Sequence, residues 1–121
     1  MSINMNKKYD FPIIPHTHWD REWYFTTSRS KIYSLNHFKE IFDVLENNKN
    51  FSHFLLDAQL SIIDDYLEFH PYDENRIKKL VTEGKLIIGP WYTQTDQMVI
   101  SGESIIRNLY YGIERAKDFG A

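Results

Sequence analysis

Three short apolar runs along the chain predict buried β-strands. Their sequences are YDFPIIPH at 9–16, SHFLLD at 52–57 and KLIIG at 85–89. Short apolar runs bounded by turn-forming residues are typical of buried strands. Pro15 lacks an amide hydrogen, which suits the end of the first strand.

Apolar residues at three- and four-residue steps predict helices at 34–48, 58–69 and 101–120. The predicted apolar faces are Leu35, Phe38, Ile41, Phe42 and Leu45; Leu60, Ile63, Tyr66 and Leu67; and Ile105, Ile106, Leu109, Ile113 and Ala116. A further helix is predicted at 73–84, where acidic residues come first and lysines later, as the helix dipole favours. The predicted N-caps are Ser34 and Ser101, and the predicted helix ends are Pro71, Gly84 and Gly120.

The resulting order is strand, helix, strand, helix, helix, strand, helix. This order predicts an α/β fold with a parallel sheet and right-handed crossovers. Three parallel strands with flanking helices make an incomplete sheet, because such strands are normally continued by neighbours. We therefore interpret residues 1–121 as the N-terminal portion of a larger barrel or sheet. The alternative is a small three-strand domain that is complete in itself.

Polar segments follow all three predicted strands. They are HTHWDREW after the first strand, DAQ after the second and WYTQTDQ after the third. In parallel α/β sheets, ligands bind outside the carboxyl ends of the strands. We therefore expect these three segments to meet and to form a site.

Composition and charge narrow the classes of function. The net charge is −3 and no basic patch stands out, which argues against nucleic acid as a partner. The chain has no cysteine, so disulfides and thiolate metal sites are excluded. Its polar start lacks the apolar stretch of a signal peptide, and no run is long enough to span a membrane. We expect a soluble cytoplasmic protein.

The most distinctive residues are His18 and Asp20. In extended backbone, residues two apart point the same way, so this imidazole and this carboxylate face one point and suit zinc. His16 shares the same parity, as a further ligand or as a hydrogen-bonding partner of one. Asp96, after the third strand, is expected at the same corner as a ligand, a nucleophile or both. The alternatives are a histidine pair that holds a turn, and an Asx turn at Asp96.

Aromatic side chains are predicted at the same end of the sheet: Trp19, Trp23, Trp91 and Tyr92. Their flat faces suit the apolar faces of sugar rings, although core packing explains Trp19 and Trp91 at least as well. Asp57, at the end of the second strand, is expected either to bind substrate hydroxyls or to cap the next helix.

Two long motifs carry a family resemblance. PHTHWDREW at 15–23 and GPWYTQTDQMVISGESIIRNLYYG at 89–112 resemble the N-terminal catalytic domain of glycoside hydrolase family 38, the retaining α-mannosidases. The WDREW form is similar to the bacterial branch, which includes mannosylglycerate hydrolases. The resemblance implies a seven-stranded parallel β/α barrel, of which this chain would supply three strands.

The resemblance also implies the roles of individual residues. His18, Asp20 and Asp96 would bind one zinc ion, and Asp96 would also be the catalytic nucleophile. Trp23 would lie against the sugar, and His16 would lie next to the ligands. The substrate would be a mannose-containing oligosaccharide or a mannoside. The family's acid/base aspartate and fourth zinc ligand lie downstream, so we expect this chain to be inactive alone, to bind zinc weakly and to self-associate.

Two other interpretations stay open from the sequence. An amidohydrolase-type barrel would place both His16 and His18 on the metal and would need neither Asp20 nor Asp96. A small non-catalytic module that binds a metal or a sugar would be complete at 121 residues.

Overall fold

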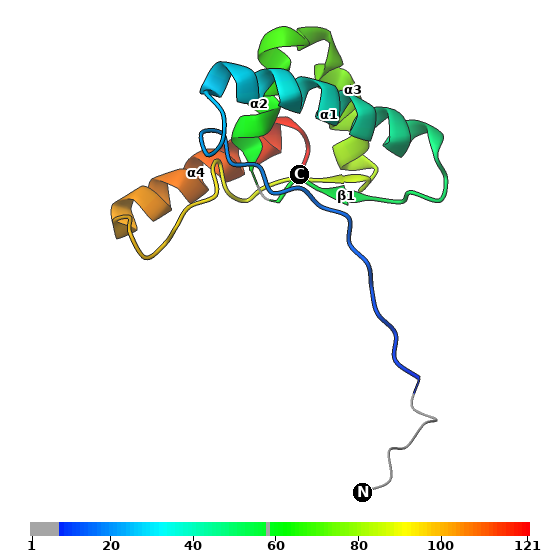
Figure 1. The fold of residues 1–121 in the computed structure, drawn as a ribbon. Coiled ribbons are helices and arrows are strands. Elements are labelled where there is room, and N and C mark those ends of the chain that lie inside the picture. The colour runs from blue at the N-terminus through cyan, green and yellow to red at the C-terminus, as the bar shows by residue number, and fades with distance from the viewer. Residues whose placement is uncertain (1–7, 58) are drawn as a thin grey trace, which may run out of the picture.

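The computed structural model describes residues 8–57 and 59–121, which form a small parallel sheet and several helices (Figure 1). The strands are β1 (Phe54–Leu55) and β2 (Leu86–Ile87). The α-helices are α1 (Thr27–Asn47), α2 (Leu60–Phe69), α3 (Glu74–Thr82) and α4 (Gly102–Asp118), and a short 3-10 helix, η1, covers Pro71–Asp73. The mixed helix and sheet architecture therefore agrees with the predicted α/β class.

The sheet is parallel, as predicted, but its first strand is reduced to a single bridge. Strands β1 and β2 pair in register, with Phe54 opposite Leu86. On the other edge of β1, His16 forms an isolated parallel bridge with Leu55. The segment before His16 makes no further ladder in the described residues, because Pro12 and Pro15 have no amide hydrogen to donate.

One face of the sheet is covered by α1, α2 and α3, and the other is open (Figure 1). Successive strand residues point to opposite faces. Accordingly, Phe54 and Leu86 are buried against the helices, whereas Ile87 is exposed on the open face. The largest fully buried side chains of the core are Phe38, Phe42, Leu45, Leu56, Leu60, Ile62, Ile63, Tyr66, Ile77, Leu80, Leu86 and Phe119.

Helix α1 begins at Thr27, so the predicted cap at Ser34 is wrong. Ser34 lies inside the helix and is buried, and its Oγ donates to the Lys31 carbonyl at 2.8 Å. Because this bond satisfies the hydroxyl locally, a serine can occupy the buried face of the helix. The buried face therefore continues toward the N-terminus from Phe38 through Ser34 and Ser30.

The other predicted helix boundaries are confirmed at Ser101, Gly84 and Gly120. Ser101 caps α4, because its Oγ accepts from the Ser104 amide at 3.2 Å. Gly84 and Gly120 follow α3 and α4 with φ of 70° and 85°, in the left-handed region that favours glycine.

The predicted apolar face of α4 is only partly buried. Gly112 and Ala116 are the buried residues of this helix, whereas Ile106 is 65% exposed. The reason is visible in Figure 1, where the first half of α4 projects beyond the body of the molecule. Small residues thus make the contact with the body. No helix within the described residues combines the length and apolar character needed to cross a membrane.

Candidate functional site

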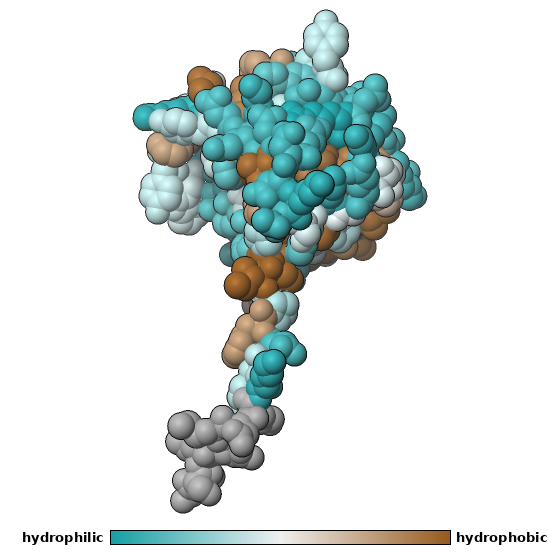
Figure 2. All heavy atoms as spheres, turned by 90° about the vertical axis from the view of Figure 1, so that its right-hand side faces the viewer, coloured by the Kyte–Doolittle hydropathy of each residue, from teal (hydrophilic) through white to brown (hydrophobic). Residues whose placement is uncertain are grey.

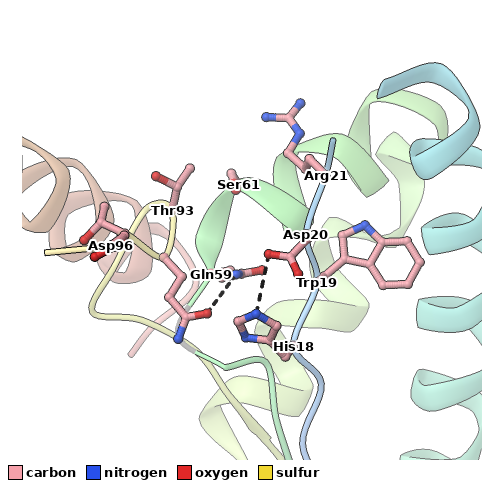
Figure 3. A pocket seen from close by; sticks show the side chains of 10 residues that line it. His18, Trp19, Asp20, Arg21, Gln59, Ser61, Thr93 and Asp96 are labelled. Carbon is pink, nitrogen blue, oxygen red and sulfur yellow. Dashed lines mark hydrogen bonds and ion pairs between the residues drawn. The ribbon is translucent and has the colours of Figure 1, made fainter. Parts of the chain in front are cut away.

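A cleft of about 400 Å³ lies where the three predicted polar segments come together. One wall is the N-terminal segment (residues 8–26), and the other is the β2–α4 loop (residues 88–101). The start of α2 lies between them (Figure 3). The lining residues are His18, Trp19, Asp20, Arg21, Gln59, Ser61, Thr93, Gln94, Thr95 and Asp96. The expected meeting of these segments at one site is confirmed.

His18 is held between two carboxylates. Its Nδ1 lies 2.7 Å from Asp57 Oδ2, and its Nε2 lies 3.5 Å from Asp20 Oδ1. The hydrogen bond with Asp57 raises the pKa of the imidazole above its ordinary value, and the negative charge of Asp20 adds to this effect. The side chain of His18 is 53% exposed, so the ring is accessible from the cleft.

Asp57 contacts His18 instead of capping α2. The N-cap of α2 is Gln59, whose own side chain makes no capping hydrogen bond. The first free amides of α2 bond the β2–α4 loop instead: Leu60 N–H donates to Trp91 O at 3.1 Å, and Ser61 N–H to Tyr92 O at 2.8 Å. These bonds satisfy the helix end and hold the loop next to it.

Helix α4 holds the same loop from its other side. The Asn108 side chain accepts from the amides of Tyr92 and Thr93 and donates to the Thr93 carbonyl at 2.6 Å. Gly112 lies against the loop backbone so closely that a Cβ there would lie 2.1 Å from the Pro90 carbonyl oxygen. The sequence interpretation assigned no role to Asn108 or Gly112, because their partners are main-chain atoms about 15 to 22 residues away.

Asp96 occupies the wall of the cleft opposite His18 and Asp20 (Figure 3). Its Oδ1 accepts from the Met98 amide at 3.1 Å, and its carbonyl oxygen accepts from the Val99 amide at 3.2 Å. The Asx-turn interpretation of Asp96 is therefore correct, and it is compatible with a place in the cleft.

Trp23 and Trp19 have different surroundings. Trp23 is 72% exposed and lines a shallow hollow that it shares with His18, Trp19 and Asp20. The Trp19 ring packs toward α1, where its Nε1 donates to Ser30 Oγ at 3.0 Å. Trp19 therefore has the packing role that the sequence left open.

Several polar residues of the cleft were not singled out from the sequence, and Gln59 and Arg21 make the clearest contacts among them. Gln59 contacts Gln94 across the cleft at 3.4 Å, and only its place in the DAQ segment pointed to it. Arg21 lies beside Asp20 in the chain, but its guanidinium donates to Asp65 on α2 at 2.9 Å. This ion pair attaches the wall that carries His18 to α2.

The donor atoms at the cleft are of the kinds that zinc binds. One imidazole and two carboxylates, from His18, Asp20 and Asp96, match the nitrogen and oxygen ligands of zinc sites. Within residues 8–57 and 59–121, however, no three His, Asp or Glu side chains gather closely enough to hold a metal ion. The chemistry of the donors fits the predicted ligands, and metal binding by them stays a prediction.

Comparison with known proteins gives a consistent result. Residues 8–120 match the model of the glycosyl hydrolases family 38 N-terminal domain. A protein from Halalkalibacterium halodurans, provisionally named a mannosylglycerate hydrolase, is 37% identical over 108 residues, which are 89% of this chain and 12% of that protein.

Two solved structures are also similar. One is an alpha-mannosidase from Enterococcus faecalis V583, with a TM-score of 0.85 and 39% identity. The other is a glycosyl hydrolase family 38 protein from Enterococcus faecalis, with a TM-score of 0.81 and 35% identity. Both matches cover 89% of this chain and 12% of the other chain, so the chain spans a small part of the length of these relatives.

Proposed function

The chain belongs to glycosyl hydrolase family 38, through the N-terminal domain of that family, and from this premise we propose that it carries the nucleophile of a retaining α-mannosidase. The observation that carries the proposal is the cleft, which is lined by His18 and Asp20 on one wall and by Asp96 on the other. The family membership also excludes the amidohydrolase-type alternative, which required His16 and His18 as the metal ligands.

The proposed reaction begins at Asp96. The Met98 amide holds Oδ1, and Oδ2 attacks the anomeric carbon of the sugar. The bond between Oδ2 and this carbon forms as the bond to the leaving oxygen breaks, and an acid donates a proton to that oxygen. Water then replaces Asp96 at the same carbon, so the configuration is retained.

Three residues of this chain would hold the metal: His18, Asp20 and Asp96. When bound, zinc would hold sugar hydroxyls and help to distort the ring toward the transition state. The contribution of the chain is to present these donors from two walls of one cleft. The Arg21 bond to Asp65 anchors the first wall, and the Asn108 bonds to Thr93 anchor the second.

The proposed substrate is a mannose-containing oligosaccharide or a mannoside. Trp23 supports this proposal, because its exposed indole borders the hollow next to His18 and Asp20 and can lie against the face of a sugar ring. Asp57 has one carboxylate oxygen bonded to His18, which leaves the other for a substrate hydroxyl. The name of the Halalkalibacterium halodurans relative makes mannosylglycerate one candidate substrate.

We further propose that the sheet belongs to a seven-stranded β/α barrel. The open face with the exposed Ile87 supports this, because strands of a parallel barrel are normally covered on both faces. The acid/base residue and a fourth metal ligand have no candidate among the residues of the cleft. The chain by itself is therefore proposed to be inactive on ordinary mannosides. Its cytoplasmic location stays a prediction.

The nucleophile can be tested without the missing acid. In 5-fluoro-α-mannosyl fluoride, fluoride leaves with little need of a proton, and the second fluorine slows release of the sugar from the protein. The chain would be incubated with this reagent and zinc, and the modified peptide would be identified by mass spectrometry.

We expect one added fluorosugar on the peptide that contains Asp96, and none in Asp96→Asn. Asp10→Asn, which changes an exposed carboxylate of the N-terminal segment, should label as the wild type does. Absence of any adduct on the wild type, or an adduct that persists in Asp96→Asn, would contradict the proposal.

A further inference from the structure

We infer that Asp57 is a positioning residue for His18: its carboxylate accepts the Nδ1–H of the imidazole and thereby selects the tautomer whose Nε2 lone pair faces Asp20 and the cleft. The tautomer follows from contacts in this chain alone. Its use for metal binding rests on the proposed function.

The two distances decide which nitrogen carries the proton. Asp57 Oδ2 lies 2.7 Å from Nδ1, which is a short hydrogen bond, whereas Asp20 Oδ1 lies 3.5 Å from Nε2. An ionised carboxylate can only accept, so Nδ1 must be the donor in the shorter contact. In a neutral imidazole the other nitrogen is then unprotonated and can bind a metal ion.

The backbone holds the two partners together. The Leu55 amide donates to the Pro15 carbonyl at 3.0 Å, and the Thr17 amide donates to the Leu55 carbonyl at 3.1 Å. His18 directly follows Thr17, and Asp57 lies two residues after Leu55. The contact therefore joins residues 39 positions apart through the edge of the sheet.

The conformation of Asp57 also indicates a role for its side chain. Its φ is 38°, in the left-handed region that a non-glycine residue adopts at a cost of about 1–2 kcal/mol. Glycine would remove this cost but also the carboxylate. Asp57 is the less exposed partner, at 23% against 53% for the His18 side chain, so the hydrogen bond is sheltered on the Asp57 side.

His16 lies two residues before His18, and its main chain forms the bridge to β1. Its place next to the metal ligands stays a prediction. For Asp57, the sequence left open a bond to substrate hydroxyls or a cap on the next helix. The contact with His18 gives Asp57 a role that does not require a substrate.

The tautomer can be measured directly in the metal-free chain. Long-range ¹H–¹⁵N spectra of ¹⁵N-histidine-labelled protein distinguish the two neutral tautomers. They would be recorded at about pH 9, well above the ordinary histidine pKa of about 6.5. His18→Gln identifies the signals of His18. Asp20→Ala is the matched variant, because it removes the other carboxylate of the same ring.

We expect mainly the Nδ1–H form in the wild type and in Asp20→Ala, and mainly the Nε2–H form in Asp57→Ala. The wild-type spectrum decides the question even where Asp57→Ala does not fold: a predominant Nε2–H form would overturn the inference. An unchanged tautomer in folded Asp57→Ala would overturn it too.

Zinc titration separates this inference from the proposed function. If both hold, Asp57→Ala should bind zinc about 10- to 100-fold more weakly than the wild type, as loss of a partner of a metal-binding histidine usually does. A wild-type chain with the Nδ1–H form but no zinc binding would contradict the proposed function and leave the positioning role intact. Equal zinc affinity of wild type and Asp57→Ala, with the tautomer changed, would overturn the role of Asp57 in metal binding.

Discussion

Asn108 pairs with the main chain of Thr93 in both directions. Its Oδ1 accepts the Thr93 amide at 2.9 Å, and its Nδ2 donates to the Thr93 carbonyl at 2.6 Å. The same Oδ1 accepts the Tyr92 amide at 3.0 Å. One side chain of α4 therefore fixes the part of the β2–α4 loop that leads to Asp96.

Replacement of Asn108 by alanine should destabilise the chain. It removes three hydrogen bonds, each worth about 0.5–1.5 kcal/mol, so the free energy of unfolding should fall by about 1.5–4.5 kcal/mol. Asn108→Asp keeps the acceptor but loses the donor to Thr93, and it should be destabilised as well. Urea unfolding measures both, with the exposed Asn36 of α1 as control: Asn36→Ala should not lower stability. Equal unfolding midpoints for wild type and Asn108→Ala would refute this role.

Replacement of Gly112 by alanine should also destabilise the chain, although alanine has the higher helix propensity. Alanine favours a helix over glycine by about 1 kcal/mol. A Cβ at Gly112, however, would lie 2.5 Å from main-chain atoms of Trp91 and Tyr92, which cannot rotate away as a side chain can. Overpacking of this kind typically costs about 1–3 kcal/mol.

The matched control is Gly102, at the start of the same helix. A Cβ there meets nothing within 4 Å, so Gly102→Ala should be neutral or slightly stabilising. Urea unfolding of the two variants would compare them. A Gly112→Ala protein as stable as Gly102→Ala would show that the loop does not pack on α4 as described.

Burial of Tyr66 should make the stability depend on alkaline pH. Desolvation, and then its hydrogen bond to Asp73, raise the pKa of Tyr66 well above its ordinary value of about 10. Because the unfolded chain releases this proton more readily, the stabilisation is complete below about pH 10 and is lost as pH rises further.

Unfolding in urea between pH 9 and 11 would measure this dependence. Tyr66→Phe should lose stability less steeply over the same range, with a residual slope from Tyr92, whose pKa is also raised by burial. An identical slope in wild type and Tyr66→Phe would be inconsistent with a buried, protonated Tyr66.

Zinc binding by the chain should be weak and should depend on the histidine in the cleft. Calorimetric titration of His18→Gln should show loss of zinc binding, because the substitution removes the imidazole whose Nε2 faces Asp20. His53→Gln is the matched control and should bind as the wild type does, since His53 bonds the neighbouring Ser52 away from the cleft. His16→Gln should also retain binding. A loss of zinc binding in His16→Gln with binding retained in His18→Gln would contradict the proposed ligands.

The chain should self-associate through exposed apolar side chains. Figure 2 shows an apolar patch where the N-terminal segment joins the body. Phe11 and Ile13 of this segment are 82% and 88% exposed. Sedimentation velocity should show association that increases with concentration, and Ile13→Lys should reduce it without loss of stability. A monomer at every concentration tested would count against this prediction.

Much of the fold could be read from local patterns. The positions of β1, β2 and the helices follow from apolar runs and helical spacing, and Ser101, Gly84 and Gly120 end or begin helices as predicted. The exceptions have local causes too. Ser34 resembles a cap but bonds a carbonyl inside α1, and the apolar face of α4 extends beyond the elements that could cover it.

The sequence by itself determined which segments form the site, because the ends of parallel strands meet whatever their detailed packing. Only the tertiary structure decided which side chains are partners within it. His18 bonds Asp57 and Asn108 bonds Thr93 because the sheet edge and α4 bring these distant residues within reach. Apolar spacing reports which face of an element is buried, but a hydrogen bond of 2.7 Å depends on the placement of whole elements relative to one another.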